Sequence, residues 1–191
     1  FTVIGIILSL SLISGVGFLG LSVRDLLYEN TINIGGDYEF EIFDINKKVI
    51  SILRNDVDLD KVGVSANEGS GSYRIDGNDD SEIFIISEDT ITLNEIFNHE
   101  LTEGRLPKES SELIIDSKAK EYLGLSINDK VKFEEITYKD GKEVKTNNFK
   151  EYTIVGFSKE SFISDGTWFN AVTYLDEIKN NKSYDIKFTV K

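Results

Sequence analysis

Residues 101–133 read LTEGRLPKESSELIIDSKAKEYLGLSINDKVKF, and this stretch says most about the fold. Residues 112–116 form an apolar run of strand length, which predicts a buried strand. The segment SKAKEYL that follows favours a short helix, and Gly124 can end it in the left-handed conformation. Another strand is predicted from Lys130 onward. A strand, a short helix and a strand in so short a segment indicate mixed α and β structure.

The sequence after this stretch predicts further strands. Lys139-Asp140-Gly141-Lys142 separates two alternating segments, 131–138 and 144–157, and Asp-Gly is a strong signal for a tight hairpin turn. Two more strands are expected at 168–175 and 184–190. Phe162, Trp168 and Phe169 are interpreted as core or hinge packing rather than as a ligand platform.

The sequence before this stretch predicts a βαβ unit. Residues 37–43 read DYEFEIF, in which Tyr38, Phe40 and Ile42 alternate with acidic residues, the pattern of a strand with one buried face. Residues 46–56 have apolar residues at helical spacing, and 59–66 have strand composition. Strands at 72–76 and 82–87 and a short helix across 92–100 follow. We therefore expect an α+β domain over residues 35–191, with a βαβ subdomain and an inserted, mostly-β subdomain.

The N-terminal segment predicts a transmembrane helix. None of the 21 basic and 34 acidic residues lies between Phe1 and Val23, and 23 helical residues span about 34 Å, against about 30 Å of bilayer hydrocarbon. A secretory signal peptide would have a shorter apolar core and a small-residue cleavage site, and a buried soluble helix would show polar residues at helical spacing. We expect a membrane helix and stalk over residues 1–34.

Small residues recur along this apolar segment. The letters at 15–20 match GxGxxG, but a dinucleotide site needs a strand before the glycines and a helix that starts at them. Small residues in a membrane helix instead let another helix approach closely. We therefore predict helix packing, and no nucleotide site, at Gly5, Ser9, Ser11, Gly15, Gly17 and Gly20.

Composition excludes several classes of function. The net charge of −13 opposes binding to nucleic acid, which needs clustered basic residues. The absence of cysteine excludes disulfides, thiolate nucleophiles and cysteine-ligated zinc, and a bacterial cell surface fits best. The chain begins at Phe1, so the basic residues that would set membrane orientation are not visible.

The motifs of enzymes and metal sites are missing from the sequence. His99 is the single histidine, and there is no HExxH, GxSxG or P-loop pattern. Two acidic runs, 56–60 and 76–82, begin like calcium loops but lack the glycine and the final glutamate that such loops require. We therefore expect no enzymatic activity and no metal or cofactor in this chain, with any ATP used by another polypeptide.

The order of these parts resembles the MacB/FtsX-like family of ABC transporter permeases. In that family a first membrane helix leads into a βαβ start, and a pattern of the type GR.P, E.vi, lgl, gd.i and y.IvGi recurs in the extracytoplasmic domain. The matching residues here are Gly104-Arg105-Leu106-Pro107, Glu112–Ile115, Leu123–Leu125, Asn128–Val131 and Tyr152–Phe157. Asn128-Asp129 stands where Gly-Asp is usual, and a turn tolerates this because asparagine accepts positive φ.

The resemblance implies a permease subunit in the bacterial cell membrane, with its domain on the extracytoplasmic face. It implies a homodimer or heterodimer of permeases, a separate cytoplasmic ABC ATPase, and an outer domain that couples helix motion to export or mechanotransmission. Gly104, Arg105 and Pro107 are then architectural residues. No further membrane spans follow Lys191, so the resemblance also implies a fragment. The alternatives are a single-pass, surface-anchored binding or sensory module and, less favoured, a surface-anchored hydrolase.

Overall fold

The computed structural model describes residues 11, 14–15, 17–18, 21–24, 35–78, 80–97, 99–159, 167–180 and 182–191. The elements in chain order are β1 (Phe40–Ile45), α2 (Lys47–Arg54), β2 (Leu59–Ile75), β3 (Glu82–Glu88), the π-helical turn η1 (Thr92–Ile96), β4 (Leu101–Gly104), β5 (Glu112–Asp116), α3 (Ser117–Leu123), β6 (Lys130–Lys139), β7 (Lys142–Ser158), β8 (Trp168–Tyr174) and β9 (Tyr184–Val190). The predicted α+β class is confirmed.

Six strands close into a small barrel. In the order β2, β3, β8, β5, β7 and β6, each strand pairs with the next, and β6 pairs back to β2. Alternate side chains of these strands point into the ring and form its core together with Ala119 of α3. The core includes Tyr73, Ile83, Leu113, Phe133, Phe157 and Phe169, all almost fully buried. This barrel is the inserted, mostly-β part that the sequence predicts.

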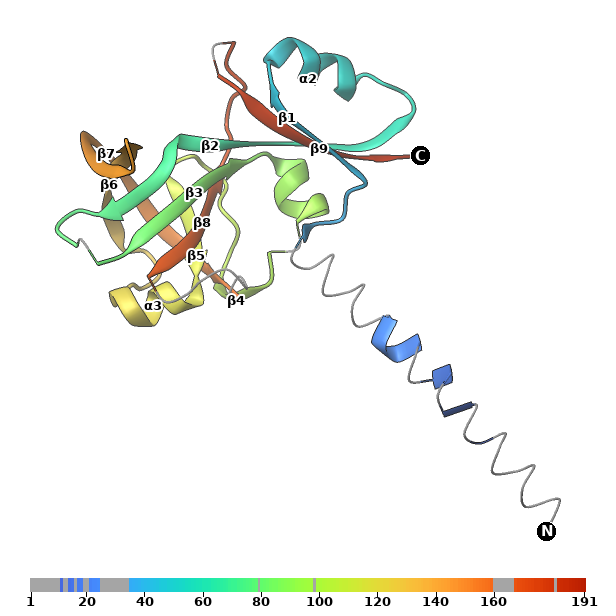
Figure 1. The fold of residues 1–191 in the computed structure, drawn as a ribbon, viewed down its shortest axis with the longest axis horizontal. Coiled ribbons are helices and arrows are strands. Elements are labelled where there is room, and N and C mark those ends of the chain that lie inside the picture. Colours follow the sequence, from blue (N-terminus) through green and yellow to red (C-terminus); the bar gives the residue numbers. More distant parts are fainter. Residues whose placement is uncertain are drawn as a thin grey trace.

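A second layer extends from one side of the barrel along β2. Strand β9 lies between β1 and β2 and is antiparallel to both, so β1 and β2 run parallel with α2 connecting them. Helix α2 packs Ile50 on the face of β2 that carries Val62 and Val64, and η1 packs on the opposite face, against Gly63. The predicted βαβ order is confirmed, with a strand from the C-terminal end inserted between its two strands. Figure 1 shows α2 and α3 at opposite ends of this assembly.

Local signals explain where several elements begin and end. The Asn46 side chain accepts hydrogen bonds from the amides of Lys48 and Val49 and so caps α2. Gly124 ends α3 with a φ of +67°. The turn between β6 and β7 has positive φ at both Asp140 and Gly141, the geometry that a two-residue hairpin favours. The strands around it, β6 and β7, match the predicted segments.

Two predictions about strands were wrong in detail. Phe40 and Ile42 of β1 are 52% and 38% exposed, so the apolar side of β1 is not the buried face that alternation suggested. The reason is that β1 is the edge strand of the sheet and α2 packs on β2 rather than on β1. The predicted strand 72–76 is the far end of the long strand β2, which continues from Leu59 across a register break between Asn67 and Ser72.

The N-terminal prediction falls mainly outside the described residues. The described residues between Ser11 and Arg24 are helical and exposed. Most of the expected membrane helix and stalk, including residues 1–10 and 25–34, is not among them. Within the described part of the chain, no helix is long and apolar enough to cross a membrane.

Candidate functional site

The chain enters the domain at a compact contact with η1. The Asp37 amide donates to the Ile96 carbonyl at 2.6 Å, and the Asp37 carboxylate pairs with Lys61 Nζ at 2.9 Å. Gly36 has a φ of +91°, and a Cβ there would lie 2.9 Å from a ring carbon of Phe97. A side chain at position 36 would therefore be strained and would push the ring away. We call Gly36, Asp37, Tyr38, Lys61, Phe97 and Lys187 the attachment cluster.

A buried lysine completes the attachment cluster from β9. Lys187 is only 8% exposed; its ammonium lies 5.7 Å from the ring centre of Tyr38 and 5.3 Å from that of Phe97. It also pairs with Glu41 at 2.6 Å. Burial, with Glu41 nearby, raises the pKa of Tyr38. A cation between aromatic faces and a carboxylate holds the start of the domain against β9.

The turn η1 is itself tied to β2 and, through Asp89, to α2 on the opposite face of the layer. The carboxylate of Asp89, which is 7% exposed, accepts from the Thr92 amide at 2.8 Å and the Val64 amide at 3.1 Å. It also pairs with Arg54 at the end of α2. His99 reaches Glu88 at 2.7 Å just beyond η1. The Asp89 carboxylate therefore links η1 to β2 and to α2.

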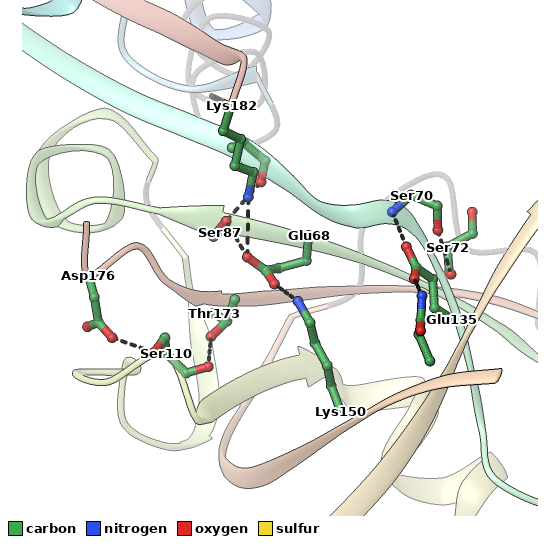
Figure 2. Close-up of polar contacts among 12 residues, drawn as sticks. Glu68, Ser70, Ser72, Ser87, Ser110, Glu135, Lys150, Thr173, Asp176 and Lys182 are labelled. Carbon is green, nitrogen blue, oxygen red and sulfur yellow. Dashed lines mark hydrogen bonds and ion pairs between the residues drawn. The ribbon is translucent and has the colours of Figure 1, made fainter. Parts of the chain in front are cut away.

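A second polar group lies where β2 passes from the layer into the barrel (Figure 2). In the register break of β2, Glu68 pairs with Lys150 of β7 and, at 3.5 Å, with Lys182 before β9, and accepts from the Ser87 hydroxyl at 3.1 Å. We call these four residues the Glu68 junction. Burial disfavours the charged form of Glu68, but both lysines and the serine outweigh it, so its pKa is lowered.

Both sides of the molecule contribute to the Glu68 junction. Lys150 belongs to the barrel, whereas Lys182 lies in the connection between β8 and β9. Lys182 also borders an open cavity of about 330 Å³ that touches Asp44, Asn67 and Asp185. Figure 2 shows two further hydrogen bonds nearby: the Ser70 amide donates to the Glu135 carboxylate at 2.6 Å, and the Thr173 hydroxyl donates to the Ser110 carbonyl at 3.1 Å. The ion pairs of Glu68 therefore connect barrel and layer at this point.

The segment Gly104–Pro107 packs closely on β7. Gly104 has a φ of +84°, and a Cβ there would lie 2.2 Å from the Val155 carbonyl oxygen. The guanidinium of Arg105 makes two hydrogen bonds to Glu112, one of 2.7 Å, which hold the pKa of Glu112 at about 2. Pro107 is buried. The segment is a tight backbone contact with one exposed ion pair.

The other residues that the sequence analysis singled out lie apart from these groups. Ser11, Gly15 and Gly17 are helical and exposed, and Gly5, Ser9 and Gly20 lie outside the described residues. In the two acidic runs, Asp76 pairs with Lys132 and Asp56 accepts from a neighbouring amide. Among the residues that the structure describes, no three acidic, histidine or cysteine side chains converge as metal ligands would.

The aromatic prediction was right for one residue and wrong for another. Phe169 is 1% exposed and lies in the barrel core, whereas Trp168 is 48% exposed. The cause is the strand period, which points consecutive residues of β8 to opposite faces. Phe162 lies outside the described residues. The sequence analysis missed the attachment cluster and the Glu68 junction, because their members are far apart in the chain; only the buried Lys187 within a strand pattern was a local signal.

Comparisons with known proteins agree on the fold. No protein-family model and no curated protein matches the chain. The extracellular domain of the noncanonic ABC-type transporter YknZ from Gram-positive bacteria superposes with a TM-score of 0.53 at 13% identity, covering 78% of this chain and 74% of that one.

A domain of a putative permease protein from Porphyromonas gingivalis superposes with a TM-score of 0.53 at 10% identity, covering 80% of this chain and 65% of that one. The periplasmic region of MacB from Actinobacillus actinomycetemcomitans overlaps with a TM-score of 0.43 at 12% identity, covering 78% and 66%. The resemblance inferred from the sequence is thus confirmed at the level of the fold: this chain folds as the extracellular domain of an ABC-type transporter does.

Proposed function

We propose that this chain is part of the permease subunit of a MacB/FtsX-like ABC transporter in a bacterial cell membrane. Residues 1–34 would anchor it, and residues 35–191 would form the extracytoplasmic domain. Two independent observations support the proposal. The fold is shared with the extracellular domain of an ABC-type transporter, and the first 23 residues carry no charge.

The attachment cluster supports the proposal that motion of the membrane helix reaches the outer domain. A domain on a loose tether would need no fixed contact at its start, but here the first residues of the domain are bonded to η1, β2 and β9. Through Asp89 and Arg54 the same contacts reach α2. ATP hydrolysis by a separate cytoplasmic ATPase would move the membrane helix, and the attachment cluster would pass that displacement to the outer domain of a permease dimer.

The test uses the full-length protein in lipid nanodiscs, co-expressed with any ABC ATPase that the neighbouring genes encode. The chain has no cysteine, so a single spin label at Glu151→Cys reports the distance between two outer domains. We expect that distance to change when ATP and vanadate are added. The double variant Asp37→Asn, Tyr38→Ala should keep ATPase binding and lose most of the change.

Asp58→Asn, an exposed carboxylate outside the attachment cluster, is the matched control and should behave as wild type. If no ATPase copurifies, the permease assignment fails and a single-pass binding or sensory module is favoured. If ATPase binds but the domain distance ignores both ATP and the double variant, the permease assignment stands and the coupling through the attachment cluster is wrong.

A further inference from the structure

The end of the β6–β7 hairpin is separated from the barrel by a bulge. The pairing register of β6 with β7 shifts between Glu134 and Ile136, and Asn147 on β7 has a φ of +58°, so the hairpin bends where it leaves the barrel. Beyond the bulge the two strands pair regularly from Ile136 up to the turn. We call residues 137–144 the hairpin end. A regular ladder beyond a bulge allows the hairpin end to move as one piece.

Two side-chain bonds tie the hairpin end to β2 and β3. Tyr138 and Glu143 are aligned partners in the hairpin. The Tyr138 hydroxyl donates to Glu82 Oε2 at 2.7 Å, and the Arg74 guanidinium on β2 donates to Glu143. The bond to Glu82 raises the pKa of Tyr138, burial and Glu143 raise it further, and Arg74 opposes them. Residues 139–142 are exposed, so these two bonds hold the hairpin end in place.

Arg74 and Glu82 also lie opposite each other on β2 and β3. The antiparallel register that pairs Tyr73 with Ile83 places Arg74 beside Glu82 on the same face of the sheet. Glu82 is 4% exposed. Its Oε1 and the Nε of Arg74 are both buried, and neither atom makes a hydrogen bond among the described residues. Each of the two bonds to the hairpin end therefore starts from a residue whose neighbour carries the complementary charge.

Removing one partner of a buried ion pair is costly, because the remaining charge loses its compensation. The side chain of Arg74 is only 17% exposed, so losing Glu143 alone would carry that cost. Glu82 lies beside Arg74 and can accept from its guanidinium in a charge-assisted bond. Release of the hairpin end therefore leaves Arg74 paired with a carboxylate, while Glu143 becomes hydrated.

We propose that the hairpin end is a latch with two positions. In the closed position Arg74 pairs with Glu143, and Tyr138 donates to Glu82. In the open position Arg74 pairs with Glu82, and the hairpin end leaves β2 and β3. The exchange of partners keeps the buried charges compensated in both positions. The latch uses no residue of the attachment cluster, so this inference is independent of the proposed transport function.

A pair of spin labels measures the position of the hairpin end, because the chain has no cysteine. The labels are attached at Lys142→Cys on the hairpin end and at Glu121→Cys on α3, both exposed positions. The full chain is measured in detergent micelles, diluted with unlabelled protein. We expect a major distance for the closed position and a minor one for the open position. Glu143→Gln should raise the minor population at least about threefold, because it removes a charge-assisted bond that only the closed position makes. An unchanged distance distribution in this variant would overturn the proposal.

A second variant distinguishes an exchange of partners from a loss of contacts alone. If Arg74 moves to Glu82 on opening, Glu82→Gln added to Glu143→Gln should lower the minor population again. If Glu82 only holds Tyr138, the same addition should raise that population, and this result would refute the exchange.

Tyr138→Phe removes a bond of the closed position and leaves Arg74 and Glu82 intact. It should raise the minor population, and it decides the matter if Glu82→Gln does not fold, since an unchanged population would contradict the latch. Glu151→Gln, which removes an exposed carboxylate of β7 outside the hairpin end, is the matched control and should give the wild-type distribution.

Discussion

The barrel and the β1–β9–β2 layer differ in how completely they enclose their apolar residues. The barrel surrounds its core on all sides, and its buried residues come from six strands and α3. The layer has one short helix on its apolar face, and Phe43, Ile52 and Val57 remain 64%, 60% and 77% exposed. A closed ring has no edge strand and encloses its inner face, whereas the layer ends at β1 and has one eight-residue helix on its apolar face. We therefore expect the barrel to hold most of the stability and the layer to open locally at lower cost.

The largest effect should come from the barrel core. Phe157 is fully buried in it, so Phe157→Ala removes a large side chain and leaves a cavity that a closed ring cannot collapse. We expect a loss of about 3–5 kcal/mol in the free energy of unfolding, measured by chemical denaturation. A loss below about 1 kcal/mol would mean that the barrel is not the main stabilising unit.

A substitution in the layer should destabilise the layer without opening the barrel. Ile50 is the buried contact of α2 with β2 and β9, and Ile50→Ala should cost about 2–4 kcal/mol at that site. Hydrogen exchange should speed up in α2 and β1 while the strands of the barrel keep their protection. Equal acceleration in both regions would show that barrel and layer unfold as one unit.

Gly104 tests the backbone contact that holds β4 on the barrel. Gly104→Ala adds both the strain of a positive φ and a collision with the Val155 carbonyl, and we expect a loss of about 2–3 kcal/mol. Gly124→Ala is the matched control, because its φ is also positive, at +67°, but nothing lies within 4 Å of the new Cβ; it should cost about 1 kcal/mol. Equal melting temperatures for the two variants would contradict the close packing.

The Glu68 junction tests how barrel and layer are connected. Glu68→Gln removes the charge that both lysines share, and the buried amide keeps fewer hydrogen bonds, so we expect a loss of about 1–2 kcal/mol. Amide exchange should rise in residues 66–72. Glu100→Gln breaks an ion pair that is 58% exposed on the Glu100 side and should change stability by less than about 0.5 kcal/mol. Similarly small losses of stability for the two variants would show that the Glu68 junction does not stabilise the connection between barrel and layer.

The smallest effect is expected in how stability depends on acidic pH. Arg105 holds the pKa of Glu112 at about 2, below its ordinary value of 4.5, so the ion pair stabilises the fold fully above pH 4.5 and is lost as the pH falls through 2. Because Arg105 is 47% exposed, we expect less than about 1 kcal/mol. Glu112→Gln should narrow the stability difference between pH 6 and pH 3 relative to wild type. An unchanged difference would show that solvent already screens the pair.

Much of the secondary structure could be predicted because its signals are local. The strand 112–116, the helix that Gly124 ends and the hairpin at Asp140-Gly141 agree with the structure to within a few residues. The side on which a strand is buried could not be predicted in the same way. In β1 the apolar face is exposed and in β8 Trp168 is exposed, because burial depends on which element covers the strand.

The sequence by itself determined the α+β class, the order of the elements, the charge-free N-terminal segment and the likeness to ABC permease domains, since these depend on composition, period and short motifs. Tertiary structure alone decided that β6 closes a ring with β2, that β9 enters between β1 and β2, and that Glu68, Lys187 and Glu82 meet their partners. Those contacts join residues from 56 positions apart, as for Glu82 and Tyr138, to more than 140 apart, as for Glu41 and Lys187. Pairing at that distance is set by the free energy of the whole packed chain, which no local pattern reports.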